Sequence, residues 1–138
     1  MNKIEPAYVT FEQAKWLKDK GFDTNVKSYY TTSEEFTPKD YYYFGNEINY
    51  NSPINDVNTI NGTISRPEQW QVVEFLRINH GIWVYTKPVL DGDGEWIFKS
   101  YIKLMNDFKA KEYQTKLCRE PQEAYSAAFD YIKENNLI

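Results

Sequence analysis

The stretch SRPEQWQVVEFLRINHGIWVYTK, residues 65–87, predicts a helix, the end of that helix and the strand that follows. Ser65 and Glu68 have the spacing of a capping box, in which two side chains bond backbone N–H groups at a helix start. Further on, the apolar residues recur every three or four positions, which is typical of one buried helix face. The residues of this face are Gln69, Val72, Val73, Leu76 and His80.

The end of this helix is predicted at Gly81. Glycine readily adopts the left-handed conformation that closes a helix. The β-branched and aromatic run Ile82–Tyr85 then indicates a strand. Pro88 is expected to prevent much continuation of that strand, since proline cannot donate to a sheet.

Similar signals outside this stretch predict two more helices. Thr10 and Gln13 form a second capping box, and Gly21 ends that helix. A last helix opens at Glu120-Pro121. Alternating or β-branched runs predict further strands at 26–32, 41–44, 96–104 and 108–117. Between them, Asn61-Gly62 favours a tight hairpin.

This order of elements predicts an α+β fold with three helices packed on one face of an antiparallel sheet of about five strands. The first two helices start alike and each precedes a strand pair, which indicates either a weak αββ repeat or the ordinary likeness of good helix starts. The length of 138 residues suits a single domain, 1–138. Within it, residues 45–64 form a loop-rich, Asn-rich insertion.

Charge and cysteine usage limit the class of protein. The chain has 16 Lys and Arg against 20 Asp and Glu, a mildly acidic balance. This argues against bulk electrostatic binding to duplex nucleic acid or to an anionic membrane. A single Cys118 and the absence of an apolar N-terminal run favour a reducing, cytoplasmic setting. We expect no membrane partner.

No catalytic, cofactor or metal signature is found in the sequence. One His80 and one Cys118 are too few ligands for a structural zinc site. The run Asp91-Gly-Asp-Gly-Glu95 lacks the length of a calcium loop and favours a hairpin turn. No glycine-rich phosphate motif occurs. The chain is therefore predicted not to be an enzyme and to need no cofactor.

Two surfaces are left as candidates for binding. The first is an aromatic cluster on the predicted strands, about half of which should face outward and could anchor a protein partner. Its residues are Tyr29, Tyr30, Tyr41, Tyr42, Tyr43 and Phe44.

The second surface is basic. Six cations and two anions lie between Lys99 and Arg119, and Lys99, Tyr101 and Lys103 fall on one strand face. A face that mixes cations with an aromatic side chain can hold single-stranded nucleic acid, although lysines also protect sheets from aggregation. The residues proposed for this interface are Lys99, Tyr101, Lys103, Lys109 and Lys111.

Three blocks of sequence add a resemblance to a known group of proteins. They are YVTFEQAKWLKDKGFD from Tyr8, PEQWQVVEFLRINHGIWVY from Pro67 and PQEAYSAAFDYIKENNLI from Pro121. The chain resembles short proteins without assigned function from gut Bacteroidetes and their phages and prophages. The resemblance implies an accessory protein, intracellular in the bacterial host or associated with a virion, and it transfers no catalytic residue.

The leading hypothesis is therefore a non-enzymatic phage or prophage accessory protein that acts by protein–protein interaction, with another protein or with a second copy of itself. The alternative is a small protein that binds single-stranded nucleic acid on its basic and aromatic sheet face.

Overall fold

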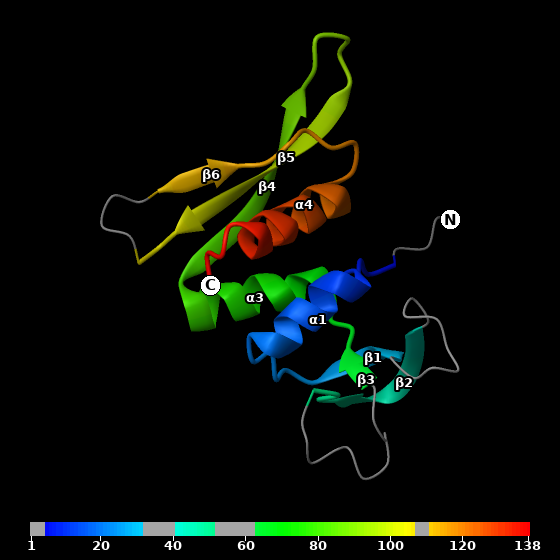
Figure 1. The fold of residues 1–138 in the computed structure, drawn as a ribbon. Helices are drawn as coiled ribbons and strands as arrows, with labels where there is room; N and C mark the ends of the chain where they lie inside the picture. Colours follow the sequence, from blue (N-terminus) through cyan, green and yellow to red (C-terminus); the bar gives the residue numbers. More distant parts are fainter. Residues whose placement is uncertain (1–4, 32–40, 52–62, 107–110) are drawn as a thin grey trace. The chain divides into compact units, whose positions relative to one another are not determined.

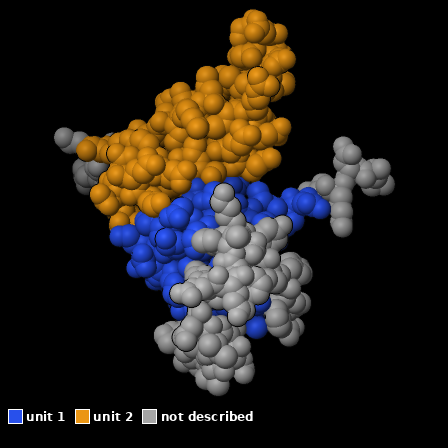
Figure 2. Space-filling view, turned by 45° about the vertical axis from the view of Figure 1, so that its right-hand side comes forward, with its two compact units in different colours: residues 1–71 blue, residues 72–138 orange. Residues whose placement is uncertain are grey.

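The computed structural model describes residues 5–31, 41–51, 63–106 and 111–138, with the backbone alone for 41–46. The chain divides into two compact units, residues 1–71 and 72–138, which Figure 2 shows in different colours. The prediction of one domain over 1–138 stays a prediction.

Unit 1 begins with helix α1, Phe11–Asp19, whose start is the predicted capping box. The Gln13 N–H donates to Thr10 Oγ1 at 3.2 Å, and the Thr10 N–H donates to Gln13 Oε1 at 3.0 Å. After the helix, Gly21 has a φ of +85°, and the Phe22 N–H donates to the Leu17 carbonyl at 2.9 Å. Both ends of α1 are therefore confirmed as local signals in the sequence.

The sheet of unit 1 has the order β2-β1-β3, with antiparallel neighbours (Figure 1). Strand β1 is Val26–Thr31, β2 is Tyr41–Ile48 and β3 is Thr63–Ser65. The register of β1 against β2 shifts between Val26 and Ser28. Strand β1 is thus bonded along both of its edges.

The predicted capping box of Ser65 and Glu68 is wrong. Ser65 is the last residue of β3, pairs with Tyr29 and is 1% exposed. Its Oγ accepts the Tyr50 N–H at 3.0 Å. The Ser65 hydroxyl therefore accepts a hydrogen bond from a buried residue of the turn after β2, and the next helix, α3, runs over Gln69–His80.

The end of α3 is where the sequence predicts it. Gly81 has a φ of +64°, and β4 starts at the next residue, Ile82. In unit 2, β4 (Ile82–Leu90), β5 (Trp96–Leu104) and β6 (Glu112–Gln114) form an antiparallel sheet of order β4-β5-β6. The predicted meander of three antiparallel strands is therefore confirmed, but β6 is shorter than the predicted strand over 108–117, of which 108–110 lie outside the described residues.

Pro88 does not end β4, contrary to the sequence-based expectation. The strand continues to Leu90, and Pro88 lies opposite Phe98 of β5. The N–H and carbonyl of Phe98 both bond Cys118 on the other side, at 2.7 Å each. The missing proline donor therefore faces the outer edge of the sheet, where it costs no hydrogen bond of the β4–β5 ladder.

Helix α4, Pro121–Glu134, covers one face of this second sheet (Figure 1). On α4, Ala128 and Phe129 are fully buried, and on the sheet Val84 is 2% exposed and Ile102 is 0% exposed. Tyr113 of β6 contacts Tyr131 of the helix, with ring centroids 5.4 Å apart. These contacts form an apolar layer under one side of β4, β5 and β6.

The predicted α+β class with three helices and antiparallel strands is confirmed for the described part of the chain. The single sheet of about five strands is wrong, because the strands form two sheets of three. The αββ repeat is not supported either, since the first strand is central in one sheet and at the edge in the other. Of the insertion predicted at 45–64, the first residues belong to β2 and the last to β3, while 52–62 and the Asn61-Gly62 hairpin lie outside the described residues.

Candidate functional site

The face of the second sheet that is opposite α4 bears a set of aromatic and basic side chains. The antiparallel register pairs Trp83 with Lys103 and Tyr85 with Tyr101, one row apart. The next row pairs Lys87 with Lys99. Since alternate residues of a strand point to opposite faces, these pairs lie away from the buried Val84 and Ile102. We call this surface the open face, made of Trp83, Tyr85, Lys87, Lys99, Tyr101 and Lys103.

Two tyrosines form the centre of the open face. The rings of Tyr85 and Tyr101 are stacked, with centroids 5.2 Å apart and planes 12° apart. The Lys87 ammonium lies 5.4 Å from the centroid of Tyr85 and 5.0 Å from that of Tyr101. A cation at this distance is attracted by the negative ring face. The three side chains therefore form one aromatic and cationic cluster from two neighbouring strands.

The orientation of Tyr85 is fixed by the third strand. Its hydroxyl donates to Glu112 Oε2 of β6 at 2.7 Å. This hydrogen bond, together with desolvation and the charges nearby, raises the pKa of Tyr85 to about 12. The phenol therefore keeps its proton at neutral pH and stays a neutral aromatic surface with a fixed hydrogen bond.

Next to this centre, the open face is exposed and more basic than acidic. Trp83 has 44% of its surface exposed, a large value for a tryptophan. Lys103 lies opposite Trp83 in the register and Glu112 lies opposite Lys103. Among the described residues of β4, β5 and β6 on this face, three lysines thus accompany one carboxylate, Glu112, which accepts the hydrogen bond from Tyr85.

The structure brings together three of the five residues predicted for nucleic acid. Lys99, Tyr101 and Lys103 lie on the same face of β5. Lys111 is exposed just before β6, while Lys109 lies outside the described residues. Sequence reasoning missed Trp83, Tyr85 and Lys87 of β4. Their alternation was visible, but the pairing register that puts them beside β5 was not.

The aromatic cluster predicted to bind a protein is only partly described. Tyr30 is 6% exposed and its hydroxyl donates to the Val9 carbonyl at 2.5 Å. Tyr29 is half-buried and packs on Tyr50, with ring centroids 4.6 Å apart. The side chains of Tyr41, Tyr42, Tyr43 and Phe44 lie outside the described residues. A protein contact at these positions stays a prediction.

The other residues considered as possible catalytic or metal-binding groups make contacts that stabilise the fold. Cys118 is buried beside the backbone of β5, and His80 lies edge to face with Phe75 at the end of α3. The Asp91 carboxylate accepts the N–H groups of Asp93 and Glu95 at 2.9 and 2.8 Å, which holds the predicted hairpin turn. In the described ranges, no group of three or more His, Cys, Asp or Glu could hold a metal ion.

Comparison with known proteins finds no matching family model, no matching curated protein and no matching solved structure. The resemblance to Bacteroidetes and phage proteins therefore stays a prediction. In the part of the chain that the structure describes, each helix is too short or too polar to cross a membrane.

Proposed function

We propose that this protein binds single-stranded nucleic acid on the open face of its second sheet. The observation that supports this most directly is the stacked pair of Tyr85 and Tyr101 with the Lys87 ammonium over both rings. Proteins that hold single strands combine aromatic side chains, on which bases stack, with cations that neutralise phosphates. The open face has both components on one surface.

The aromatic side chains of the open face offer stacking surface at two neighbouring pairs of residues across β4 and β5. Tyr85 and Tyr101 form one row and the exposed Trp83 belongs to the next. Base stacking on an aromatic side chain contributes about 1–3 kcal/mol per base and tolerates any base. We therefore expect the open face to bind two or three nucleotides with little sequence preference.

The basic part favours phosphates locally although the whole chain has a formal net charge of −4. Lys99 and Lys103 flank Tyr101 on β5, and Lys87 lies opposite Lys99. Three phosphate contacts predict a slope of about −2 for the logarithm of affinity against the logarithm of salt on a single strand. Duplexes are expected to bind more weakly, because their bases are stacked inside and cannot reach the tyrosines.

The test is the fluorescence anisotropy of labelled ten-nucleotide single strands of DNA and RNA, titrated with the full chain at two salt concentrations. The double variant Lys99→Glu/Lys103→Glu should lose at least about tenfold in affinity. The matched control, Lys20→Glu/Lys133→Glu, makes the same change in net charge at two lysines that do not belong to the open face, and its affinity should fall much less.

Stacking is tested separately from charge. Tyr101→Leu keeps an apolar strand residue but removes the ring, and should weaken binding about fivefold or more. An abasic strand of the same length keeps the phosphates without the bases and should bind clearly less well. Equal affinity for abasic and normal strands, equal losses in the two double variants, or no binding by the wild type at low salt would each overturn the proposal. Circular dichroism of each variant checks that it is folded.

A further inference from the structure

Unit 1 contains a separate pocket that the open face does not use. Its volume is about 510 Å³. Its walls come from the segment before α1, the turn between α1 and β1, β1 itself, the end of β2, the segment between β3 and α3, and the first turn of α3. Such a volume is within the range of small-molecule sites in proteins.

One wall already contains a cation on an aromatic ring. The guanidinium of Arg66 lies 3.8 Å from the ring centroid of Tyr8 and 5.6 Å from that of Tyr30. Its Nη1 also donates to Ser28 Oγ at 3.1 Å. Arg66 is thus held by contacts with Tyr8 and Ser28. This arrangement shows that the pocket accommodates a guanidinium stacked on an aromatic face.

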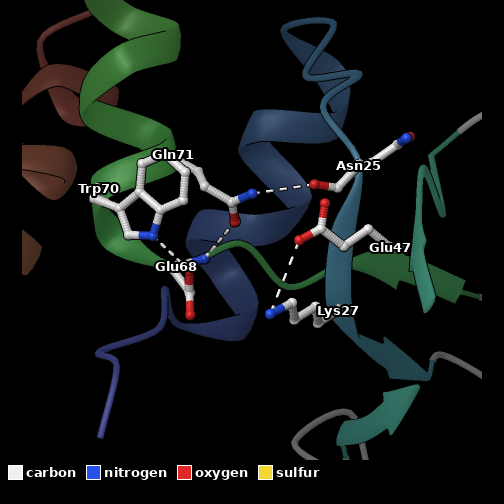
Figure 3. Close-up of polar contacts among 6 residues, drawn as sticks. All are labelled: Asn25, Lys27, Glu47, Glu68, Trp70 and Gln71. Atoms are coloured by element: carbon white, nitrogen blue, oxygen red, sulfur yellow. Dashed lines mark hydrogen bonds and ion pairs between the residues drawn. The ribbon is translucent and has the colours of Figure 1, made fainter. Parts of the chain in front are cut away.

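Another part of the lining offers a further aromatic ring with a carboxylate beside it. Trp70, in the first turn of α3, is 61% exposed, and its indole N–H donates to Glu68 Oε2 (Figure 3). This bond sets the plane of the indole next to a negative charge. An indole face is the strongest aromatic partner for a cation, and a neighbouring carboxylate adds a charge-assisted hydrogen bond.

The wall around Trp70 is fixed before any ligand arrives. The Gln71 side chain donates to the Asn25 carbonyl at 3.1 Å and accepts the Glu68 N–H at 3.0 Å. It therefore ties the start of α3 to the turn before β1, as Figure 3 shows. A preformed wall lowers the entropy cost of binding.

The residues that line the pocket carry one more negative than positive charge, which favours a cation over an anion. Three carboxylates, Asp23, Glu47 and Glu68, face two cations. Arg66 is stacked on Tyr8, and Lys27 lies 3.9 Å from Glu47. An anionic ligand would have to approach the carboxylates, whereas a cation near Trp70 is attracted by both the ring and Glu68.

We infer that this pocket binds an alkylguanidinium or alkylammonium group, with the cation over Trp70 and bonded to Glu68. The group belongs either to a free amine or guanidine compound or to an arginine or lysine side chain of a peptide. The site is independent of the open face, and its ligand need not be nucleic acid.

The test follows the indole N–H signal of Trp70 by ¹H–¹⁵N NMR in the full chain, with the signal assigned by Trp70→Phe. Butylguanidinium should shift this signal in a saturable way, with a Kd of the order of 1 mM. Butylurea has a similar shape without the charge and should leave the signal in place. Glu68→Gln keeps an oxygen that can accept the hydrogen bond from the Trp70 indole N–H but removes the negative charge. It should lower the affinity for butylguanidinium about fivefold. The matched control, Glu123→Gln on α4, should not change its affinity.

A blocked tripeptide Gly-Arg-Gly distinguishes the two sources of the cation. Tighter binding of the tripeptide than of butylguanidinium would assign the site to a peptide side chain, and tighter or equal binding of butylguanidinium would assign it to a free compound. Equal shifts with butylurea, an unchanged affinity in Glu68→Gln, or no shift at 20-fold above the expected Kd, about 20 mM, would overturn the inference.

Discussion

The two sheets contain three strands each, but the first strand of each has a different place. In unit 1, β1 is central, and its neighbours β2 and β3 bond both of its edges. In unit 2, β4 lies at the edge, and the strands follow one another as a meander. Both sheets bury serine side chains, Ser28 and Ser65 in the first and Ser100 in the second. The second sheet has an apolar face under α4 and an open face on the other side. Two sheets with the same number of strands therefore differ in which strand is central.

The largest expected effect concerns the apolar layer of unit 2. Phe129→Ala removes a ring that is 0% exposed on α4, and should lower the free energy of unfolding by about 3–5 kcal/mol. Its control is Trp96→Ala, whose side chain is 63% exposed at the start of β5 and should cost less than about 1 kcal/mol. Urea unfolding followed by far-UV circular dichroism measures both. Similar losses for the two variants would contradict an apolar layer centred under α4.

A smaller effect is expected from the hydroxyl groups that hold unit 1. Ser65→Ala leaves the Tyr50 N–H without its acceptor, next to the buried strand β3. This loss should lower the free energy of unfolding by about 1–3 kcal/mol. The corresponding change in unit 2 is Ser100→Ala. It removes a hydroxyl contact with the half-buried Thr115, whose own hydroxyl can turn to water, and should cost less than Ser65→Ala. The same unfolding experiment compares them, and the reverse order would show that unit 1 does not depend on this bond.

The smallest effect is a pH dependence on the open face. The pKa of Tyr85 is raised to about 12, chiefly by its hydrogen bond to Glu112. On unfolding, this phenol returns to a pKa of about 10. The raised pKa of Tyr85 therefore contributes to the free energy of unfolding. This contribution is fully present below pH 10 and is lost as the pH rises from about 10 to about 12.

Glu112→Gln should move the ionisation of Tyr85 to lower pH, because it removes the carboxylate that disfavours the phenolate. Phenolate absorbance measures this titration, and the Tyr85→Phe difference spectrum identifies its contribution. Glu123→Gln on α4 is the control and should leave the titration unchanged. A Tyr85 titration that does not respond to Glu112→Gln would mean that the hydrogen bond does not set its pKa.

Elements that depend on nearby residues could be predicted from the sequence. The capping box of Thr10 and Gln13 and the helix end at Gly81 were located correctly, as was the face shared by Lys99 and Lys103. Ser65 shows the limit of such signals, since its spacing to Glu68 matches a capping box but its hydroxyl bonds Tyr50, fifteen residues away in the chain. A local motif predicts a contact only when no distant partner competes for the same group.

The sequence by itself determined the α+β class, the ends of α1 and the alternation along β5, because these depend on interactions within about four residues or on the two-residue period of a strand. The tertiary structure alone decided that β3 pairs with β1 and that the donor-free side of Pro88 faces the sheet edge. It also placed Tyr85 of β4 beside Tyr101 of β5. The physical reason is that the strand register depends on which distant segments bury their surfaces together, and such pairing leaves no fixed spacing in the sequence.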